Sequence, residues 1–263
     1  EVAVASGSLR STAVTCDEAS GGFVAIWGTV NEAGKFHLDA TALSTDPLTA
    51  SAPLRVDQGA HDAFEGELAA APDGTILAVY EDDRDGEGVC CREIYGRLLR
   101  SGTSLSALGA DFNVSQNHPI EQFLPAVAWD STNFFVAYSD DRENVGNDER
   151  RLYGRPVGLD GAVGVEVKIG GDSRWQVFAS MAPSGTGQIL VVWGDYDAVD
   201  GSLDAGYRAR LVAPDGTALS EVLTLVRYGN QLYDRPAVAW SAVAGAWLVA
   251  WTQPYAIHGT WVT

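Results

Sequence analysis

Carboxylates and arginines recur together in the middle of this chain. An acidic residue stands two positions after the aromatic residue that closes an apolar run in three places: Asp82, Asp140 and Asp195. An arginine follows each of these acids fifteen positions later: Arg97, Arg155 and Arg210. Because a buried charge requires a partner, we interpret the three sets as structural ion pairs across a hairpin. The alternative is that the carboxylates serve as ligands or catalysts.

More acidic residues extend the loops that follow these aromatic residues. The segment 83–87 (Asp83-Arg-Asp-Gly-Glu87) combines oxygen ligands with a glycine turn, as calcium loops do. It lacks the spacing of an EF-hand and its distal bidentate glutamate. A solvated acidic hairpin is the favoured interpretation. If Ca²⁺ binds, the predicted ligands are Asp83, Asp85 and Glu87, and the acids between Asp197 and Asp204 offer a second place.

Aromatic, amide and imidazole side chains gather in the segments that connect successive repeats. Phe64, Phe123 and Phe178 recur in the repeats and are predicted to pack between them. The other residues of these segments could stack on the C–H faces of sugars and bond their hydroxyls. The predicted ligand-binding residues are His61, His118, Gln122, Trp175, Tyr228, Tyr233 and Arg235.

Recognisable catalytic motifs are missing from the sequence. The four histidines have no metal-ligand spacing, and Gly-x-Ser-x-Gly, phosphate-loop and His-Glu-x-x-His patterns do not occur. Paired carboxylates of the glycosidase type stay open as an alternative, because only their separation in space would identify them.

An apolar segment that ends in an aromatic residue occurs five times, and the groups described above stand at fixed places relative to it. The closing aromatic residues, Trp27, Tyr80, Tyr138, Trp193 and Trp251, are 53, 58, 55 and 58 residues apart. Strand-like units at a period near 55 are typical of a β-propeller. The sequence therefore predicts an all-β fold, a single five-bladed β-propeller.

Each repeat divides into four short strands separated by turn residues. The last repeat stops after its third strand, and Val2–Ala5 is predicted to supply the missing strand and so close the ring. The predicted blades of the single domain 1–263 span residues 9–58, 65–116, 124–170, 179–226, and 234–263 together with 1–8.

The charge of the chain limits its partners. There are 35 acidic and 17 basic residues, which gives a formal net charge of −18. Such a surface repels phosphate backbones and anionic lipid surfaces. No apolar run approaches the roughly 18 to 20 residues that span a bilayer. We therefore expect neither nucleic-acid binding nor membrane insertion, and we expect a monomer.

The three cysteines, Cys16, Cys90 and Cys91, do not form a zinc pattern. Cys90 and Cys91 could form a vicinal disulfide, one of them could pair with Cys16, or all three could be free thiols. The vicinal disulfide requires an oxidising compartment.

Two of the repeats resemble a family of known sequences. The units Val-Tyr80-Glu-Asp-Asp-Arg84…Ile94-Tyr-Gly-Arg97 and Ala-Tyr138-Ser-Asp-Asp-Arg142…Leu152-Tyr-Gly-Arg155…Asp160-Gly161 resemble repeats of large secreted proteins of bacteria, notably myxobacteria. This resemblance implies a secreted or cell-surface propeller and carries over no catalytic residues. The number of blades is similar to that of five-bladed tachylectin-2-type lectins, an analogy of architecture alone.

These observations favour a secreted ligand-binding propeller that binds carbohydrate through its loop face, as a lectin does. One alternative is a glycoside hydrolase or lyase that uses carboxylates around the central channel. A second alternative is a calcium-stabilised scaffold for protein contacts.

Overall fold

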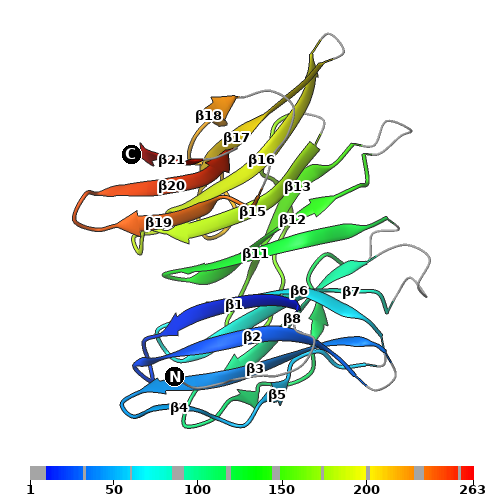
Figure 1. The fold of residues 1–263 in the computed structure, drawn as a ribbon, viewed down its shortest axis with the longest axis vertical. Helices are drawn as coiled ribbons and strands as arrows, with labels where there is room; N and C mark the ends of the chain where they lie inside the picture. The colour runs from blue at the N-terminus through cyan, green and yellow to red at the C-terminus, as the bar shows by residue number, and fades with distance from the viewer. Residues whose placement is uncertain are drawn as a thin grey trace. The chain divides into compact units, whose positions relative to one another are not determined.

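The computed structural model describes residues 10–31, 34–59, 61–84, 92–116, 120–143, 149–172, 175–199, 202–227, 234–253 and 256–263. These residues form five antiparallel sheets, and the described part of the chain contains no helix (Figure 1). Accordingly, no helix long and apolar enough to cross a membrane occurs in it. The all-β class is therefore confirmed, and five sheets fit the five predicted blades. The described chain forms two compact units, residues 1–127 with 157–163 and residues 128–156 with 164–263.

The first two sheets belong to the first unit. In the first sheet the strand order is β1-β2-β3-β4, and β5 pairs with β3. Its strands are β1 (Arg10–Asp17), β2 (Gly22–Val30), β3 (Phe36–Thr45), β4 (Leu48–Ala50) and β5 (Leu54–Arg55). In the second sheet the order is β10-β8-β7-β6, and β9 pairs with β8. Its strands are β6 (Ala63–Ala70), β7 (Thr75–Asp82), β8 (Glu93–Arg100), β9 (Ser106–Ala107) and β10 (Phe112–Asn113).

Three further sheets complete the described chain, in the orders β11-β12-β13-β14, β15-β16-β17-β18 and β19-β20-β21. The third sheet consists of β11 (Gln122–Asp130), β12 (Asn133–Asp140), β13 (Arg151–Val157) and β14 (Val167–Lys168). The fourth consists of β15 (Trp175–Pro183), β16 (Ile189–Val199), β17 (Ser202–Val212) and β18 (Leu223–Arg227). The fifth consists of β19 (Ala237–Ser241), β20 (Ala246–Gln253) and β21 (Ala256–Val262). The segment Val2–Ala5, which was predicted to close the last blade, lies outside the described residues.

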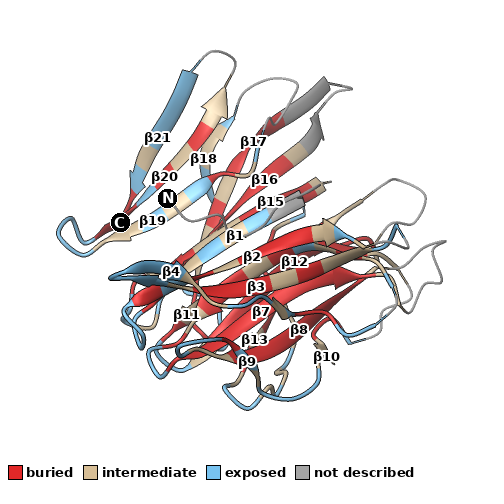
Figure 2. Cartoon of the chain, turned by 60° about the horizontal axis from the view of Figure 1, so that its bottom comes forward, coloured by how far each residue is buried: buried red, intermediate tan, exposed pale blue. Residues whose placement is uncertain are grey.

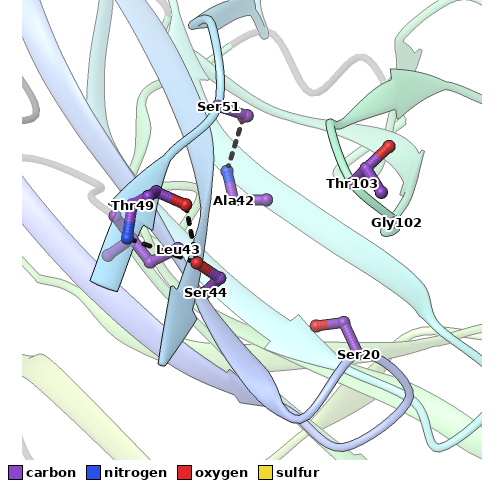
Figure 3. A pocket seen from close by; sticks show the side chains of 8 residues that line it. All are labelled: Ser20, Ala42, Leu43, Ser44, Thr49, Ser51, Gly102 and Thr103. Atoms are coloured by element: carbon purple, nitrogen blue, oxygen red, sulfur yellow. Dashed lines mark hydrogen bonds between the residues drawn. The ribbon is translucent and has the colours of Figure 1, made fainter. Parts of the chain in front are cut away.

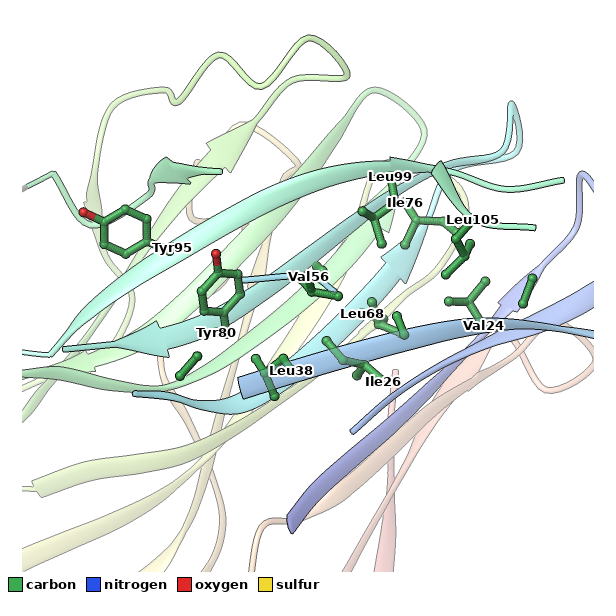
Figure 4. Packing of buried hydrophobic residues seen from close by; sticks show 14 residues of the cluster. Val24, Ile26, Leu38, Val56, Leu68, Ile76, Tyr80, Tyr95, Leu99 and Leu105 are labelled. Atoms are coloured by element: carbon green, nitrogen blue, oxygen red, sulfur yellow. The ribbon is translucent and has the colours of Figure 1, made fainter. Parts of the chain in front are cut away.

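The apolar segment that occurs five times forms the second strand of each sheet, and the burial of this strand explains its apolar composition. All eight residues of β7 and seven of the eight residues of β12 are buried (Figure 2). A strand covered on both faces has no polar side to present, so its residues do not alternate in polarity. In the first unit, Ile26 and Leu38 of the first sheet pack against Leu68 and Tyr80 of the second (Figure 4).

The glycine of the repeated Tyr-Gly-Arg unit is required by packing between strands. A Cβ atom on Gly154 would lie 2.6 Å from Cζ of Phe135 and 2.8 Å from Cδ1 of Ile169. On Gly96 it would lie 3.0 Å from Cγ2 of Val114. Glycine at these positions therefore lets the neighbouring buried side chains close over the strand.

A residue with a left-handed backbone recurs in the first strand of three sheets, and two of these strands carry a bulge there. Glu65, Leu124 and Phe178 have φ angles of 47°, 54° and 58°, in the left-handed region that non-glycine residues rarely adopt. The strand register shifts between Phe64 and Glu67 and between Val177 and Ser180. Such bulges redirect backbone groups and side chains, often beside functional sites.

Candidate functional site

In the second and third sheets the repeated aspartate is held by an arginine two positions later in the chain, Arg84 for Asp82 and Arg142 for Asp140. Arg84 donates hydrogen bonds from Nε and Nη2 to the two oxygens of Asp82, at 2.8 and 2.6 Å. The same guanidinium bonds Asp111 at 2.7 Å and lies 4.0 Å from the ring centroid of Tyr95. The hydroxyl of Tyr80 also donates to Asp111, at 2.7 Å. Every charged atom of this buried cluster therefore has a partner.

The third sheet repeats the same cluster. Arg142 bonds Asp140 at 2.8 and 2.6 Å and Glu166 at 2.9 Å, and it lies 4.1 Å from the ring centroid of Tyr153. The hydroxyl of Tyr138 donates to Glu166. The tyrosine, aspartate and arginine residues of the repeated sequence motif therefore have a structural role in this cluster.

The prediction that Asp82 pairs with Arg97, Asp140 with Arg155 and Asp195 with Arg210 is wrong. Each aspartate has a different arginine as its partner. Asp82 lies opposite Glu93 in the β7–β8 ladder, whereas Arg97 lies opposite Ala78. Four residues of strand separate the two positions by about 13 Å. In the fourth sheet Asp195 instead pairs with Arg208, at 3.0 Å.

The three predicted arginine partners have other roles. Arg97 donates from Nη1 to the carbonyls of Arg55 and Val56, at 2.9 and 3.0 Å. Arg210 donates in the same way to the carbonyl of Ile169, at 3.0 Å. Arg155 donates to the carbonyl of Gly164 and to the hydroxyl of Tyr138. Arg97 and Arg210 thus tie their sheets to the backbone that precedes each sheet.

A different glutamate, Glu81, lies at the end of β7 and was not singled out from the sequence. Its side chain is 1% exposed and pairs with Nη1 of Arg92 at 2.8 Å. It also accepts a hydrogen bond of 2.8 Å from the backbone N–H of Leu124, the residue of β11 with a left-handed φ angle. Arg92 lies 4.8 Å from the ring centroid of Phe64 and 3.6 Å from Glu121.

Two aspartates complete the acidic group at this end of the second sheet. Asp62 accepts hydrogen bonds from Nζ of Lys35 at 2.9 Å and from the N–H of Phe36 at 2.7 Å. Asp83 accepts a bond of 2.8 Å from the N–H of Asp62. We call Asp62, Glu81, Asp83, Arg92 and Glu121 the carboxylate cluster. All five residues belong to the first unit.

The environments of the cluster shift two of its carboxyl groups in opposite directions. Burial raises the pKa of Glu81 above its ordinary value, although bonds from Leu124 and Arg92 oppose this effect. Burial also acts to raise the pKa of Asp62, but the bonds from Lys35 and Phe36 prevail and lower it. Carboxyl groups whose pKa values are shifted in opposite directions are suited to the separate roles of acid and base.

An equivalent position in the second unit carries aromatic residues. Arg150 lies 3.5 Å from Asp141, and its guanidinium lies 5.3 Å from the ring centroid of Trp175. Trp175 makes an edge contact with Tyr196, with ring centroids 5.7 Å apart. Trp175 is half-buried, so part of its ring is open to a ligand.

The other predicted ligand-binding residues are spread over different environments. His61 is exposed and Arg235 is half-buried. Gln122 is fully buried and its amide donates to the carbonyl of Ile120, which argues against a ligand contact. His118, Tyr228 and Tyr233 lie outside the described residues.

The predicted metal and disulfide positions are only partly described. Asp83 belongs to the carboxylate cluster, whereas Asp85, Glu87, Cys90 and Cys91 lie outside the described residues. Within the described ranges no group of three or more metal-ligating side chains could hold an ion. Cys16 is an exposed free thiol.

Known structures share this fold at low sequence identity. No family model matches the chain, and no curated protein matches it significantly. An α-L-arabinanase of Penicillium chrysogenum, complexed with arabinobiose, is similar with a TM-score of 0.69 at 15% identity, over 96% of this chain and 77% of that one. The GH93 α-L-arabinofuranosidase of Fusarium graminearum, also with arabinobiose, has a TM-score of 0.68 at 14% identity, over 95% and 77%. An endo-arabinase of Bacteroides thetaiotaomicron reaches 0.53 at 12%, over 96% and 93%.

These neighbours are propeller-like, carbohydrate-active enzymes. At such identity the similarity shows a shared fold. The resemblances to myxobacterial repeats and to tachylectin-type lectins stay predictions.

Proposed function

We propose that this protein is a glycoside hydrolase whose reaction takes place at the carboxylate cluster, and that its five sheets are the blades of one propeller. The observation that carries this proposal is the buried carboxyl group of Glu81, which Arg92 and the N–H of Leu124 hold at the same end of the second sheet as Asp62 and Asp83. The opposite pKa shifts of Glu81 and Asp62 agree with it. The similarity to arabinan-degrading enzymes supports it.

In this proposal Glu81 is the proton donor to the glycosidic oxygen. Its burial favours the protonated form, which a general acid needs. The hydrogen bonds from Nη1 of Arg92 and from the N–H of Leu124 fix the carboxyl group in one orientation. Asp62 stays ionised, because Lys35 and the N–H of Phe36 stabilise its charge. It acts as the base or the nucleophile of the reaction, and the stereochemistry of the product distinguishes these two roles.

The substrates to test first are α-L-arabinofuranosides and arabinan, because two of the similar structures contain arabinobiose. A net charge of −18 disfavours anionic polysaccharides at this site. Secretion, a monomeric state and Ca²⁺ binding at Asp83 stay predictions from the sequence.

Binding of carbohydrate without hydrolysis is the second candidate. It is favoured by the ion pair of Glu81 with Arg92, which stabilises the ionised form of the carboxyl group, and by the half-buried ring of Trp175. In this case Trp175 would stack on a sugar ring.

The two candidates differ in what they do to a polysaccharide. Wild-type protein is incubated with arabinan and with an aryl α-L-arabinofuranoside, and the products are followed by ¹H NMR. The hydrolase proposal predicts the appearance of arabinose or arabino-oligosaccharides with one anomer formed first. Retarded migration in an arabinan-containing gel without any product would contradict hydrolysis and support binding alone.

A further inference from the structure

A pocket of about 380 Å³ lies in the first unit, at the opposite end of the strands from the carboxylate cluster. It is formed by the β1–β2 turn, the paired ends of β3 and β4, and the β8–β9 turn (Figure 3). The turns approach closely here, since a Cβ atom on Gly74 would lie 2.8 Å from Oγ of Ser101 and 3.1 Å from Cβ of Ala19. The volume falls within the roughly 300–1,000 Å³ typical of small-molecule sites.

Hydroxyl groups dominate the polar lining of this pocket. Five of its eight lining residues carry one: Ser20, Ser44, Thr49, Ser51 and Thr103. No charged or aromatic side chain lines it; the other lining residues are Ala42, Leu43 and Gly102. The lining therefore offers neutral donors and acceptors next to small apolar groups.

Some of these hydroxyls are already held in place by the protein. Ser44 and Thr49 are bonded to each other through their hydroxyls at 2.7 Å, and Oγ of Ser51 accepts from the N–H of Ala42 at 3.1 Å. Thr103 lines the pocket from the β8–β9 turn. Ser44 also bonds the carbonyl of Pro47 and the N–H of Thr49, and Ser51 also bonds Thr41 and the carbonyl of Ala52, so the sites of these two hydroxyls are occupied. Because each hydroxyl has one donor and two acceptor sites, those of Ser20 and Thr49 keep acceptor sites for a ligand.

Two buried oxygens beside the lining are also unsatisfied. Among the described residues, Oδ1 of Asp17 and Oγ of Ser101 have no hydrogen-bond partner. Asp17 accepts a bond from the lining residue Ser20 through its other oxygen, and Ser101 precedes the lining residue Gly102. Buried polar atoms without partners are costly and uncommon, so they favour a polar occupant nearby.

We propose that this pocket is a second carbohydrate-binding site, which takes a neutral sugar residue without cleaving it. The hydroxyls of Ser20, Thr49 and Thr103 would bond the sugar hydroxyls, and Ala42 and Leu43 would contact its C–H groups. A charged sugar would find no opposite charge in the lining and would lie near the Asp17 carboxyl group. The proposal does not depend on hydrolysis at the carboxylate cluster.

The test is an NMR titration of the ¹⁵N-labelled full chain. The probes are L-arabinose, D-xylose, D-galactose and D-glucose, with N-acetylneuraminate as the charged comparison. At least one neutral sugar is expected to shift the amide signals of Ser44, Thr49, Ser51 and Thr103 in a saturable manner, and N-acetylneuraminate is expected to leave them in place. If none of the neutral sugars shifts these amide signals, the proposal is overturned.

Two variants connect the binding to the pocket. Gly102→Phe should fill the pocket and abolish the shifts; a Cβ atom there lies no closer than 3.6 Å to another atom, so the backbone tolerates it. Thr103→Val removes one hydroxyl at constant shape and should weaken binding about two- to tenfold. Thr132→Val, at an exposed turn of the second unit, is the matched control and should bind as wild type does.

The sugar affinities of the two pocket variants test the proposal. Unchanged affinity in both pocket variants, with circular dichroism showing that they are folded, would overturn it. If Gly102→Phe does not fold, Thr103→Val alone decides. Loss of binding in these variants with hydrolysis of arabinan unchanged would show that the second site is separate from the proposed reaction. Conversely, failure of the hydrolase proposal would leave the NMR result unaffected.

Discussion

The carboxylate of Asp82 is held by Arg84, which stands only two positions later in the chain and bonds both of its oxygens. Asp82 is 3% exposed and Arg84 is 18% exposed. A charge pair that is this well buried gives little net stability, but removal of one partner leaves an uncompensated buried charge.

Replacement of the arginine should therefore be costly. Arg84→Gln is expected to lower the free energy of unfolding by about 3 kcal/mol, as measured by urea denaturation. Arg100→Gln is the control, because Arg100 and Asp73 form a pair at 3.5 Å with both side chains more than 40% exposed, and such pairs contribute about 0–1 kcal/mol. Equal losses in the two variants would show that the buried cluster has no special role.

A double-mutant cycle distinguishes the observed partner of Asp82 from the one that fifteen-residue spacing suggests. Asp82→Asn combined with Arg84→Gln should show a coupling energy of about 1–3 kcal/mol, whereas Asp82→Asn combined with Arg97→Gln should show less than about 0.5 kcal/mol. Strong coupling to Arg97 would mean that the hairpin register is different in solution.

A further prediction concerns the glycine of the Tyr-Gly-Arg unit. Gly154→Ala places a methyl group 2.6 Å from Cζ of Phe135, and overpacking of this kind costs about 1–3 kcal/mol. Gly171→Ala is the control, since its Cβ atom would meet only Nη1 of Arg208, at 3.9 Å. Thermal denaturation of both variants measures the difference, and an unchanged melting temperature for Gly154→Ala would contradict this packing.

Acid should destabilise the protein through Asp111 and Glu166. Burial acts to raise the pKa of each, but the bonds from Arg84 and Tyr80 lower that of Asp111, and those from Arg142 and Tyr138 lower that of Glu166. Because the folded-state pKa lies below the unfolded one, this stability is present above the ordinary values of 3.8 and 4.5 and is lost as the pH falls through the lowered pKa.

Asp111→Asn tests this linkage. The variant should be less stable than wild type at neutral pH and should lose less additional stability below about pH 4. Urea denaturation across this pH range gives both quantities. Parallel pH profiles for variant and wild type would contradict the lowered pKa of Asp111.

Local repetition was enough to predict the sheets but not the pairing within them. Trp27 and its four counterparts identified the buried second strands, because a strand buried on both faces is apolar throughout. The pairing of Asp82 with Arg97 failed because spacing along the chain does not fix the register of a hairpin. Asp82 and Arg84 both belong to the repeated motif. Two charged residues this close in the sequence do not, however, indicate that they are buried together.

The carboxylate cluster could be predicted only in part. Glu81 interrupts an apolar strand where the corresponding residues are Ser139 and Gly194, and this departure was an available signal. Its contact with the N–H of Leu124 depends on the left-handed backbone of Leu124 in β11, which the sequence does not reveal. The hydroxyl-lined pocket is built from separate turns, and serine and threonine are too common in turns to mark it.

The most direct test of the proposed reaction is the rate of arabinan hydrolysis by the Glu81→Gln variant. Glutamine keeps the shape of the side chain and the bond from Leu124 but cannot donate a proton as an acid does. The expected result is a loss of at least about 100-fold in kcat, with Glu221→Gln, at an exposed position, as active as wild type. Full activity of a folded Glu81→Gln variant would contradict the role assigned to Glu81.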